Sequence, residues 1–183
     1  MVGAPIVALI AFTFMAALIY VANVSNAHDS AAARRETRLL TLALERQETA
    51  ISAMAVEYGE WDDAYDKIVR QFDAAWADTN FYPSTFDHLA VYDEAGKLVY
   101  ERSSPQVLEQ LGPRLHASEM LGARTGDMIR RVNFAFDHGL GPVTSYELGP
   151  DDQLISVATI VIHPASGPAN ASRRLYLFAF DLI

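Results

Sequence analysis

The chain opens with a long run of apolar, uncharged residues. Residues 2–24 contain no Asp, Glu, Lys or Arg, and residues 5–22 alone would form a helix of about 27 Å, close to the ~30 Å hydrocarbon core of a bilayer. A cleaved signal peptide ending near Ala27 is the alternative, but no Lys or Arg precedes the run, and the run is longer than a usual signal core. The pattern predicts a retained transmembrane anchor over residues 1–27 and a separate domain over 28–183.

A second pattern, in which apolar side chains alternate at spacings of four and three, runs over residues 40–72. Gln47 is the one polar residue in this stripe. Such spacing is typical of a helix that buries one face, either against a sheet of its own domain or along the seam of a dimer. We expect one helix over 31–58 and a second over 62–77. Gly59 is the natural kink between them, since glycine inside a helix costs about 1 kcal/mol relative to alanine.

In the second half of the chain, short apolar runs replace the helical stripe. Pro83 ends the helical region, and residues 93–96 give a hairpin signal between two short strand-like runs. A mostly helical segment over 105–121 is interrupted near Gly112-Pro113. The expected strands are 89–92, 98–100, 143–148, 154–162 and 175–182, with loops at 122–126, 137–142 and 164–172. Long helices followed by about five antiparallel strands predict an α+β fold.

Composition narrows the possible functions. The chain has no cysteine, which excludes disulfides, Cys-ligated zinc and thiol catalysis. All of its Asp, Glu, Lys and Arg residues lie after position 28, so the second part carries the whole net charge of −9. That charge disfavours nucleic acid and anionic lipid surfaces as partners. The roughly 155 residues after the anchor fit one domain.

The sequence contains no convincing catalytic or metal-binding pattern. Five carboxylates gather near the expected kink: Glu57, Glu60, Asp62, Asp63 and Asp66. They lack the spacing of a calcium loop and are better explained as the solvated start of a helix. No two histidines have the H-x-x-x-H spacing, and His163, beside Pro164, lies either near a pocket mouth or in a surface turn. Without a Gly-x-Ser-x-Gly or P-loop motif, we predict no catalytic site, no metal site and no cofactor.

Aromatic and polar side chains also gather around the expected kink. Those that would line a small-ligand pocket are Trp61, Asp62, Tyr65, Trp76 and Asn80. Aromatic walls with a few fixed polar groups are what ligand sites need. Arg130 would add a guanidinium that clamps a carboxylate ligand. The alternative, which fits the stripe better, is that Trp61, Tyr65 and Trp76 are core residues that join helix to sheet.

Several segments of the chain together match a known family of sensing modules. They are Trp61-Asp62-Asp63-x-Tyr65, Trp76, Asn80-Phe81, Val91-Tyr92-Asp93-x-x-Gly96-x-Leu98-Val99-Tyr100, Pro164 and Phe180-Asp181-Leu182. In this order they resemble the fourth class of CHASE domains, and the resemblance covers about residues 30–183. The order of helices and strands is also similar to that of Cache and PAS-like sensor domains.

The resemblance implies a periplasmic or extracellular input domain, attached to the inner membrane and typically found before GGDEF or EAL modules. It outweighs the positive charges that follow the apolar run, which alone would place that side in the cytoplasm. We therefore expect a fragment of a longer protein that controls synthesis or breakdown of cyclic-di-GMP. The alternatives are an input domain of a histidine kinase or chemoreceptor, and a ligand-free dimerisation module. The expected partners are an unidentified small molecule, the membrane and a second copy of the chain.

Overall fold

The computed structural model describes the backbone of residues 3–83, 86–111, 116–149, 152–166 and 173–183. The side chains of 3–14, 16–19, 21–31 and 110–111 are outside this description. The chain divides into two compact units, residues 1–45 and 46–183. The helix α1 (Gly3–Gly59) contributes residues to both units, and each unit is considered by itself below.

The first unit consists of helix α1 alone over its described residues. The side chains of residues 32–43 are all exposed, among them Leu39, Leu40 and Leu42. A helix long and apolar enough to cross a bilayer is not found among the described residues. Most side chains of the anchor predicted over 1–27 lie outside those residues, so the anchor stays a prediction.

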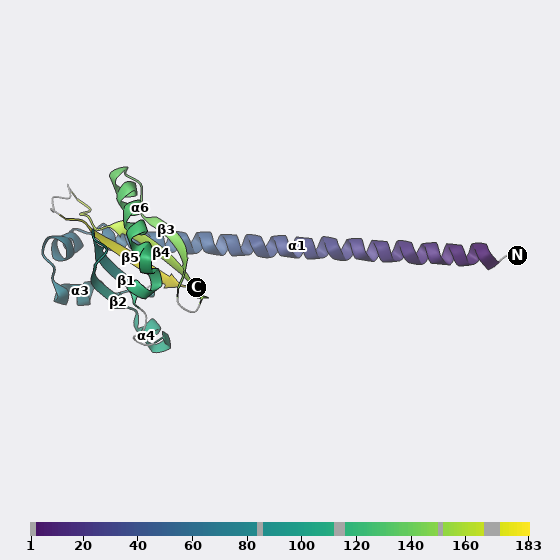
Figure 1. Ribbon diagram of the computed structural model, residues 1–183, viewed down its shortest axis with the longest axis horizontal. Helices are drawn as coiled ribbons and strands as arrows, with labels where there is room; N and C mark the ends of the chain where they lie inside the picture. Colours follow the sequence, from purple (N-terminus) through teal and green to yellow (C-terminus); the bar gives the residue numbers. More distant parts are fainter. Residues whose placement is uncertain (1–2, 84–85, 112–115, 150–151, 167–172) are drawn as a thin grey trace. The chain divides into compact units, whose positions relative to one another are not determined.

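The second unit is built on a five-stranded antiparallel sheet with the strand order β2-β1-β5-β4-β3 (Figure 1). The strands are β1 (His88–Asp93), β2 (Leu98–Ser103), β3 (Val143–Leu148), β4 (Leu154–Val161) and β5 (Leu175–Leu182). The three internal strands are β1, β5 and β4, so strands from both ends of the sequence pair in the middle of the sheet. The predicted α+β fold with five antiparallel strands is confirmed.

Both faces of this sheet are buried, which explains why β4 and β5 read as continuous apolar runs. Alternate residues of a strand point to opposite faces. One core contains Ala158 and Ile160 of β4, and the second core contains Val157 and Val161 of the same strand. All residues of β4 except Leu154 are buried.

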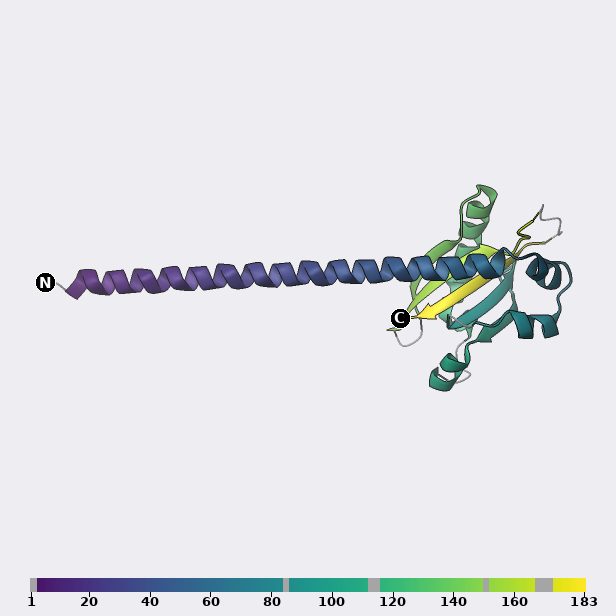
Figure 2. The ribbon, with the colours of Figure 1, turned by 180° about the vertical axis from the view of Figure 1, so that it is seen from behind.

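The helices that cover the first face come from the segment before β1. They are the last turns of α1, α2 (Asp62–Ala64), the π-helix η1 (Tyr65–Arg70) and α3 (Ala74–Asn80). Ile51 and Ala55 of α1 and Ile68 of η1 are buried in this core. The second face is covered by α5 (Ala117–Leu121) and α6 (Thr125–Asp137), which follow α4 (Pro105–Leu111). Figures 1 and 2 show α6 and the last turns of α1 on opposite sides of the sheet.

The prediction of one helix over 62–77 is wrong. The chain is helical over α2 and η1, breaks at residues 71–73, and becomes helical again in α3. Gln71 and Asp73 have extended backbone angles, and the Asp73 side chain accepts a hydrogen bond from the Trp76 amide at 3.0 Å. Asp73 therefore caps a new helix, because a carboxylate at this position satisfies an N–H group that has no helical partner.

Helix α6 was missed by the sequence analysis, which assigned no element to residues 127–136 and a loop to 122–126. The loop prediction is wrong, because the 3-10 turn η3 (Gly122–Arg124) leads directly into α6 at Thr125. The buried side chains of α6 include Met128, Ile129, Val132 and Ala135, at helical spacing. The expected helix over 105–121 is observed as α4 and α5, separated by residues 112–116, of which the structure describes only His116.

Candidate ligand pocket

The candidate site begins where α1 ends. A Cβ atom on Gly59 would lie 2.3 Å from Cγ2 of Ile160, so only glycine lets the helix end lie this close to β4. The Gly59 carbonyl accepts a hydrogen bond from the His163 amide at 2.9 Å. Trp61 then has an extended backbone, with φ −141° and ψ 123°. The turn is therefore held by the close approach of Gly59 to the Ile160 side chain of β4 and by a backbone hydrogen bond to the segment that follows β4.

The turn opens beside a pocket of about 360 Å³, which we call the tryptophan pocket. Its lining residues are Glu57, Tyr58, Glu60, Trp61 and Asn80. The Trp61 ring packs on Trp76, with centroids 5.1 Å apart. The Tyr58 hydroxyl donates a hydrogen bond to the Tyr82 carbonyl at 2.7 Å, and the Asn80 side-chain amide donates one to the Trp76 carbonyl at 2.9 Å. These bonds hold the wall of the pocket in place.

The structure brings together three of the six residues proposed from the sequence. Trp61 and Asn80 line the tryptophan pocket, and Trp76 packs on Trp61. Tyr65 is 6% exposed and belongs to the core under this region. Its burial agrees with the alternative interpretation of a residue that joins helix to sheet.

The other two proposed residues have local partners. Asp62 is exposed and accepts hydrogen bonds from the amide and hydroxyl of Ser166, at 3.0 and 2.7 Å. These bonds lower the pKa of Asp62, and the geometry indicates that this side chain tethers the chain after β4. Arg130 lies on α6, which covers the other face of the sheet, and pairs with Asp127 at 3.0 Å.

Three of the lining residues were not proposed as ligand contacts. Tyr58 was assigned only to the apolar stripe, whereas Glu57 and Glu60 were set aside as a solvated helix start. The available signal was their position, because both acidic residues lie within one turn of the predicted helix end and beside Trp61. In the structure, the part of the chain that is described holds no group of three His, Cys, Asp or Glu side chains able to bind a metal ion.

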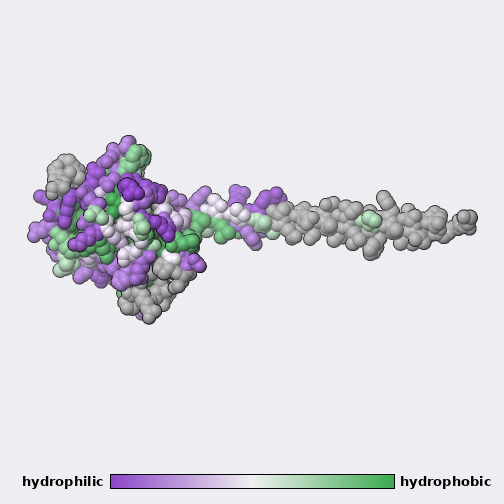
Figure 3. Space-filling view, in the orientation of Figure 1, coloured by the Kyte–Doolittle hydropathy of each residue, from purple (hydrophilic) through white to green (hydrophobic). Residues whose placement is uncertain are grey.

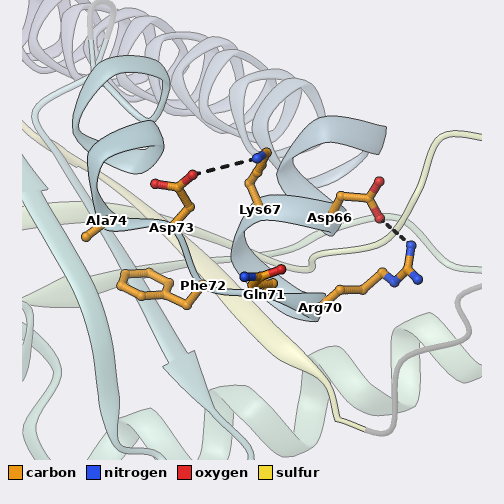
Figure 4. A pocket seen from close by; sticks show the side chains of 7 residues that line it. All are labelled: Asp66, Lys67, Arg70, Gln71, Phe72, Asp73 and Ala74. Carbon is orange, nitrogen blue, oxygen red and sulfur yellow. Dashed lines mark hydrogen bonds and ion pairs between the residues drawn. The ribbon is translucent and has the colours of Figure 1, made fainter.

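A second, larger pocket of about 660 Å³ lies along η1 and the segment that follows it (Figure 4). We call it the ion-pair pocket; its lining residues are Asp66, Lys67, Arg70, Gln71, Phe72, Asp73 and Ala74. Lys67 lies 3.7 Å from Asp73, and Arg70 lies 2.9 Å from Asp66. Each charged side chain that lines it therefore has a partner of opposite charge, which leaves little unmatched charge for a ligand.

Replacing Asp73 with alanine is expected to lower the free energy of unfolding by about 1 kcal/mol, since it removes the cap of α3. Asp66→Ala is the matched control: it removes only the exposed pair with Arg70, so we expect a change of less than about 0.5 kcal/mol. Urea unfolding of the three proteins measures the difference. Equal losses for Asp73→Ala and Asp66→Ala would contradict the capping role.

Two further polar clusters lie on the sheet away from the pockets. His88 is 1% exposed, and burial lowers its pKa to about 4 against the opposing effect of Glu101; its Nδ1 lies 2.7 Å from the Ser103 hydroxyl. Near the end of β5, Asp181 accepts a hydrogen bond from Gln47 of α1. Burial, followed by the charge of Asp87, raises the pKa of Asp181 to about 6.

Comparison with known proteins agrees with this architecture. The family model described as CHASE4 domain matches residues 43–183, which include the last turns of α1, the pockets and the entire sheet. The chain therefore belongs to the CHASE4 domain family. Domains of the CHASE type are extracellular sensory modules of membrane proteins, so this chain is a sensory domain.

The other comparisons add little to this assignment. The search of curated proteins returned no match. Among solved structures, the crystal structure of the LOV protein of Rhodobacter sphaeroides is similar over 56% of this chain, with 16% sequence identity and a TM-score of 0.33. The match spans 62% of that protein's chain. We draw nothing further from a likeness of this size.

Proposed function

We propose that this chain is the extracytoplasmic input domain of a membrane-bound bacterial signalling protein. Residues after about 28 lie in the periplasm or outside the cell, and residues 1–27 attach them to the inner membrane. Family membership supports the sensory role, and the uncharged run at the start of the chain supports the attachment. The ligand site is the tryptophan pocket, with Trp61, Trp76 and Asn80 as the residues that the sequence had already indicated.

The course of α1 is the observation that carries this proposal. Its last turn contributes Glu57 and Tyr58 to the tryptophan pocket, and Ile51 and Ala55 of the preceding turns are packed in the core. The same helix extends back to Gly3. A ligand that alters the packing of the last turn would act on the element that leads to the proposed anchor. Such coupling requires two packings with different affinities for the ligand.

The proposed output is synthesis or breakdown of cyclic-di-GMP by a GGDEF or EAL module in the same protein. The gene sequence beyond the codon for Ile183 tests this directly. A second apolar span followed by either module supports the proposal. A kinase or methyl-accepting module in that place would keep the sensory role but contradict the cyclic-di-GMP output. A stop codon within a few residues would contradict transmembrane signalling.

In the protein that carries the output module, Trp61→Ala is expected to change the cellular level of cyclic-di-GMP by about fivefold or more, the scale of typical allosteric coupling. Phe134→Ala is the control, since Phe134 is an exposed aromatic residue of α6, which covers the other face of the sheet. Equal responses of the two variants, at equal protein levels, would contradict a signalling role for the pocket.

We also propose that the chain forms a homodimer through α1. Leu39, Leu40 and Leu42 are exposed on this helix, and Figure 3 shows apolar patches along its described part. Leu39 and Leu42, three positions apart, lie on one face of the helix, and this exposed apolar face supports pairing with a second copy. Light scattering of the detergent-solubilised chain gives the mass of the protein component, and a monomer at micromolar concentration would contradict the dimer.

A further inference from the structure

The tryptophan pocket is lined by side chains that favour one class of ligand. Its aromatic wall is formed by Tyr58 and Trp61, and its polar groups are Glu57, Glu60 and Asn80. At about 360 Å³ it lies at the small end of the range for ligand sites. A small molecule that fits it would meet an aromatic surface and three polar side chains at once.

The polar groups of this pocket offer hydrogen-bond acceptors. One N–H of the Asn80 side-chain amide is bonded to the Trp76 carbonyl, and its Oδ1 oxygen can act as an acceptor. Glu57 has no ion pair or hydrogen bond with its side chain among the described residues. Glu60 has His163 as a neighbour, with Nε2 and Oε1 3.5 Å apart. A ligand that matches the two carboxylates and the Oδ1 oxygen must bring hydrogen-bond donors.

The charge of the pocket is negative and is not balanced by its own lining. No lysine or arginine is among the lining residues, in contrast to the ion-pair pocket. Glu57 lies in the last turn of α1, Glu60 is the first residue after this helix, and both line the same pocket. A cation between them would be held by both carboxylates and by the electron-rich face of Trp61.

The end of α1 adds a second electrostatic argument. The C-terminal end of a helix carries partial negative charge, so basic side chains stabilise it and acidic ones do not. The last turn of α1 contains no basic residue, yet Glu57 lies in this turn and Glu60 follows it directly. A bound cation would relieve the repulsion between these carboxylates and the helix end.

We propose that the tryptophan pocket binds a small organic cation with a primary ammonium or guanidinium group, which donates hydrogen bonds to Glu57, Glu60 and Asn80. This inference deepens the proposed sensory function and rests on it, because the cation is the signal that the pocket detects. A metal ion is a poorer fit, because the described residues provide no group of three metal-binding side chains here.

The two tryptophans of the chain provide the assay. Trp61 and Trp76 are its only tryptophans; Trp61 lines the pocket and Trp76 packs on Trp61, so tryptophan fluorescence reports on this region alone. The full chain in detergent is titrated with n-butylammonium and with 1,4-diaminobutane, and n-butanol serves as the uncharged analogue. We expect a saturable change with the two amines and none with butanol at the same concentration.

Variants of the two glutamates test the roles of individual residues. Glu57→Gln/Glu60→Gln removes both charges from exposed positions and is expected to weaken amine binding about tenfold or more. The matched control, Glu36→Gln/Glu109→Gln, removes the same charge from exposed positions elsewhere and should bind as the unmodified chain does. Thermal unfolding confirms that all three proteins are folded.

Three results of these titrations would overturn the inference. These are the absence of saturable binding to either amine, equal binding of butanol, and an equal loss of affinity in the control variant. Because this assay does not depend on an output module, its failure leaves the proposed cyclic-di-GMP control intact. Conversely, a different output module would leave amine binding intact.

Discussion

Replacing Gly59 with alanine is expected to lower the free energy of unfolding by about 1–3 kcal/mol, the usual cost of forcing an extra methyl group into a packed core. The added Cβ would lie 2.3 Å from Cγ2 of Ile160. Ile160 is 4% exposed and lies on β4, inside the sheet, and its branched Cβ leaves it little freedom to move. Relief of the clash must therefore displace the end of α1 or the strand.

Gly126→Ala is the matched control for this experiment. Gly126 lies in the first turn of α6, and the nearest atom to an added Cβ is Nη1 of Arg130 at 3.8 Å. Alanine is the better helix former, so we expect no loss of stability and a gain of up to about 1 kcal/mol. Urea unfolding of both variants measures the contrast. A Gly59→Ala protein as stable as the unmodified chain would contradict the close contact between α1 and β4.

Replacing Asp181 with asparagine is expected to stabilise the domain at neutral pH by about 1–2 kcal/mol, a value reduced because the carboxyl is only half-buried. Burial and then the charge of Asp87 raise the pKa of Asp181 from 3.8 to about 6. The folded state therefore binds the proton more tightly than the unfolded state. In the unmodified chain, protonation of Asp181 stabilises the folded state. That contribution is complete below about pH 4 and is lost as the pH rises through 6.

The contribution of Asp181 is measured as the difference in the free energy of unfolding between Asp181→Asn and the unmodified chain at each pH. His88, whose pKa is lowered to about 4, contributes stability that is lost as the pH falls from 6.5 toward 4, so it opposes Asp181 in the unmodified chain. The difference between the two proteins cancels His88. We expect this difference to grow between pH 4 and 7 in urea unfolding. Asp63→Asn, at an exposed position, is the control, and a difference independent of pH would contradict the raised pKa of Asp181.

Asp181 also explains the one polar residue in the apolar stripe. Gln47 interrupts a pattern that otherwise predicts an entirely apolar face, and sequence analysis offers no reason for it. In the structure, the Gln47 amide donates a hydrogen bond to Asp181, at the end of β5. The two residues are 134 positions apart. A contact over such a separation leaves no periodic signal in either segment, so only the fold reveals the pair.

The sequence by itself determined the long helix, the five strands and the family. These features follow from local patterns, because the alternation of apolar side chains along each segment matches the repeat of one secondary structure. The structure places Trp61, Trp76 and Asn80 side by side, while their role as ligand contacts stays a prediction. Trp61 directly precedes α2, and Trp76 and Asn80 lie in α3, so the three residues come from segments that are close together in the chain.

Only the tertiary structure decided what the remaining residues do. Gly59 is required for contact with β4, a strand about a hundred positions away, rather than for flexibility. Arg130 is separated from the pocket by the sheet, since α6 crosses the face opposite to α1. Glu57 and Glu60 line one pocket with Trp61 and Asn80, which brings the end of α1 beside the end of α3. The physical reason is the same for these residues. Packing brings together segments that are distant in sequence, whereas the apolar pattern of a segment indicates only which of its own residues are buried.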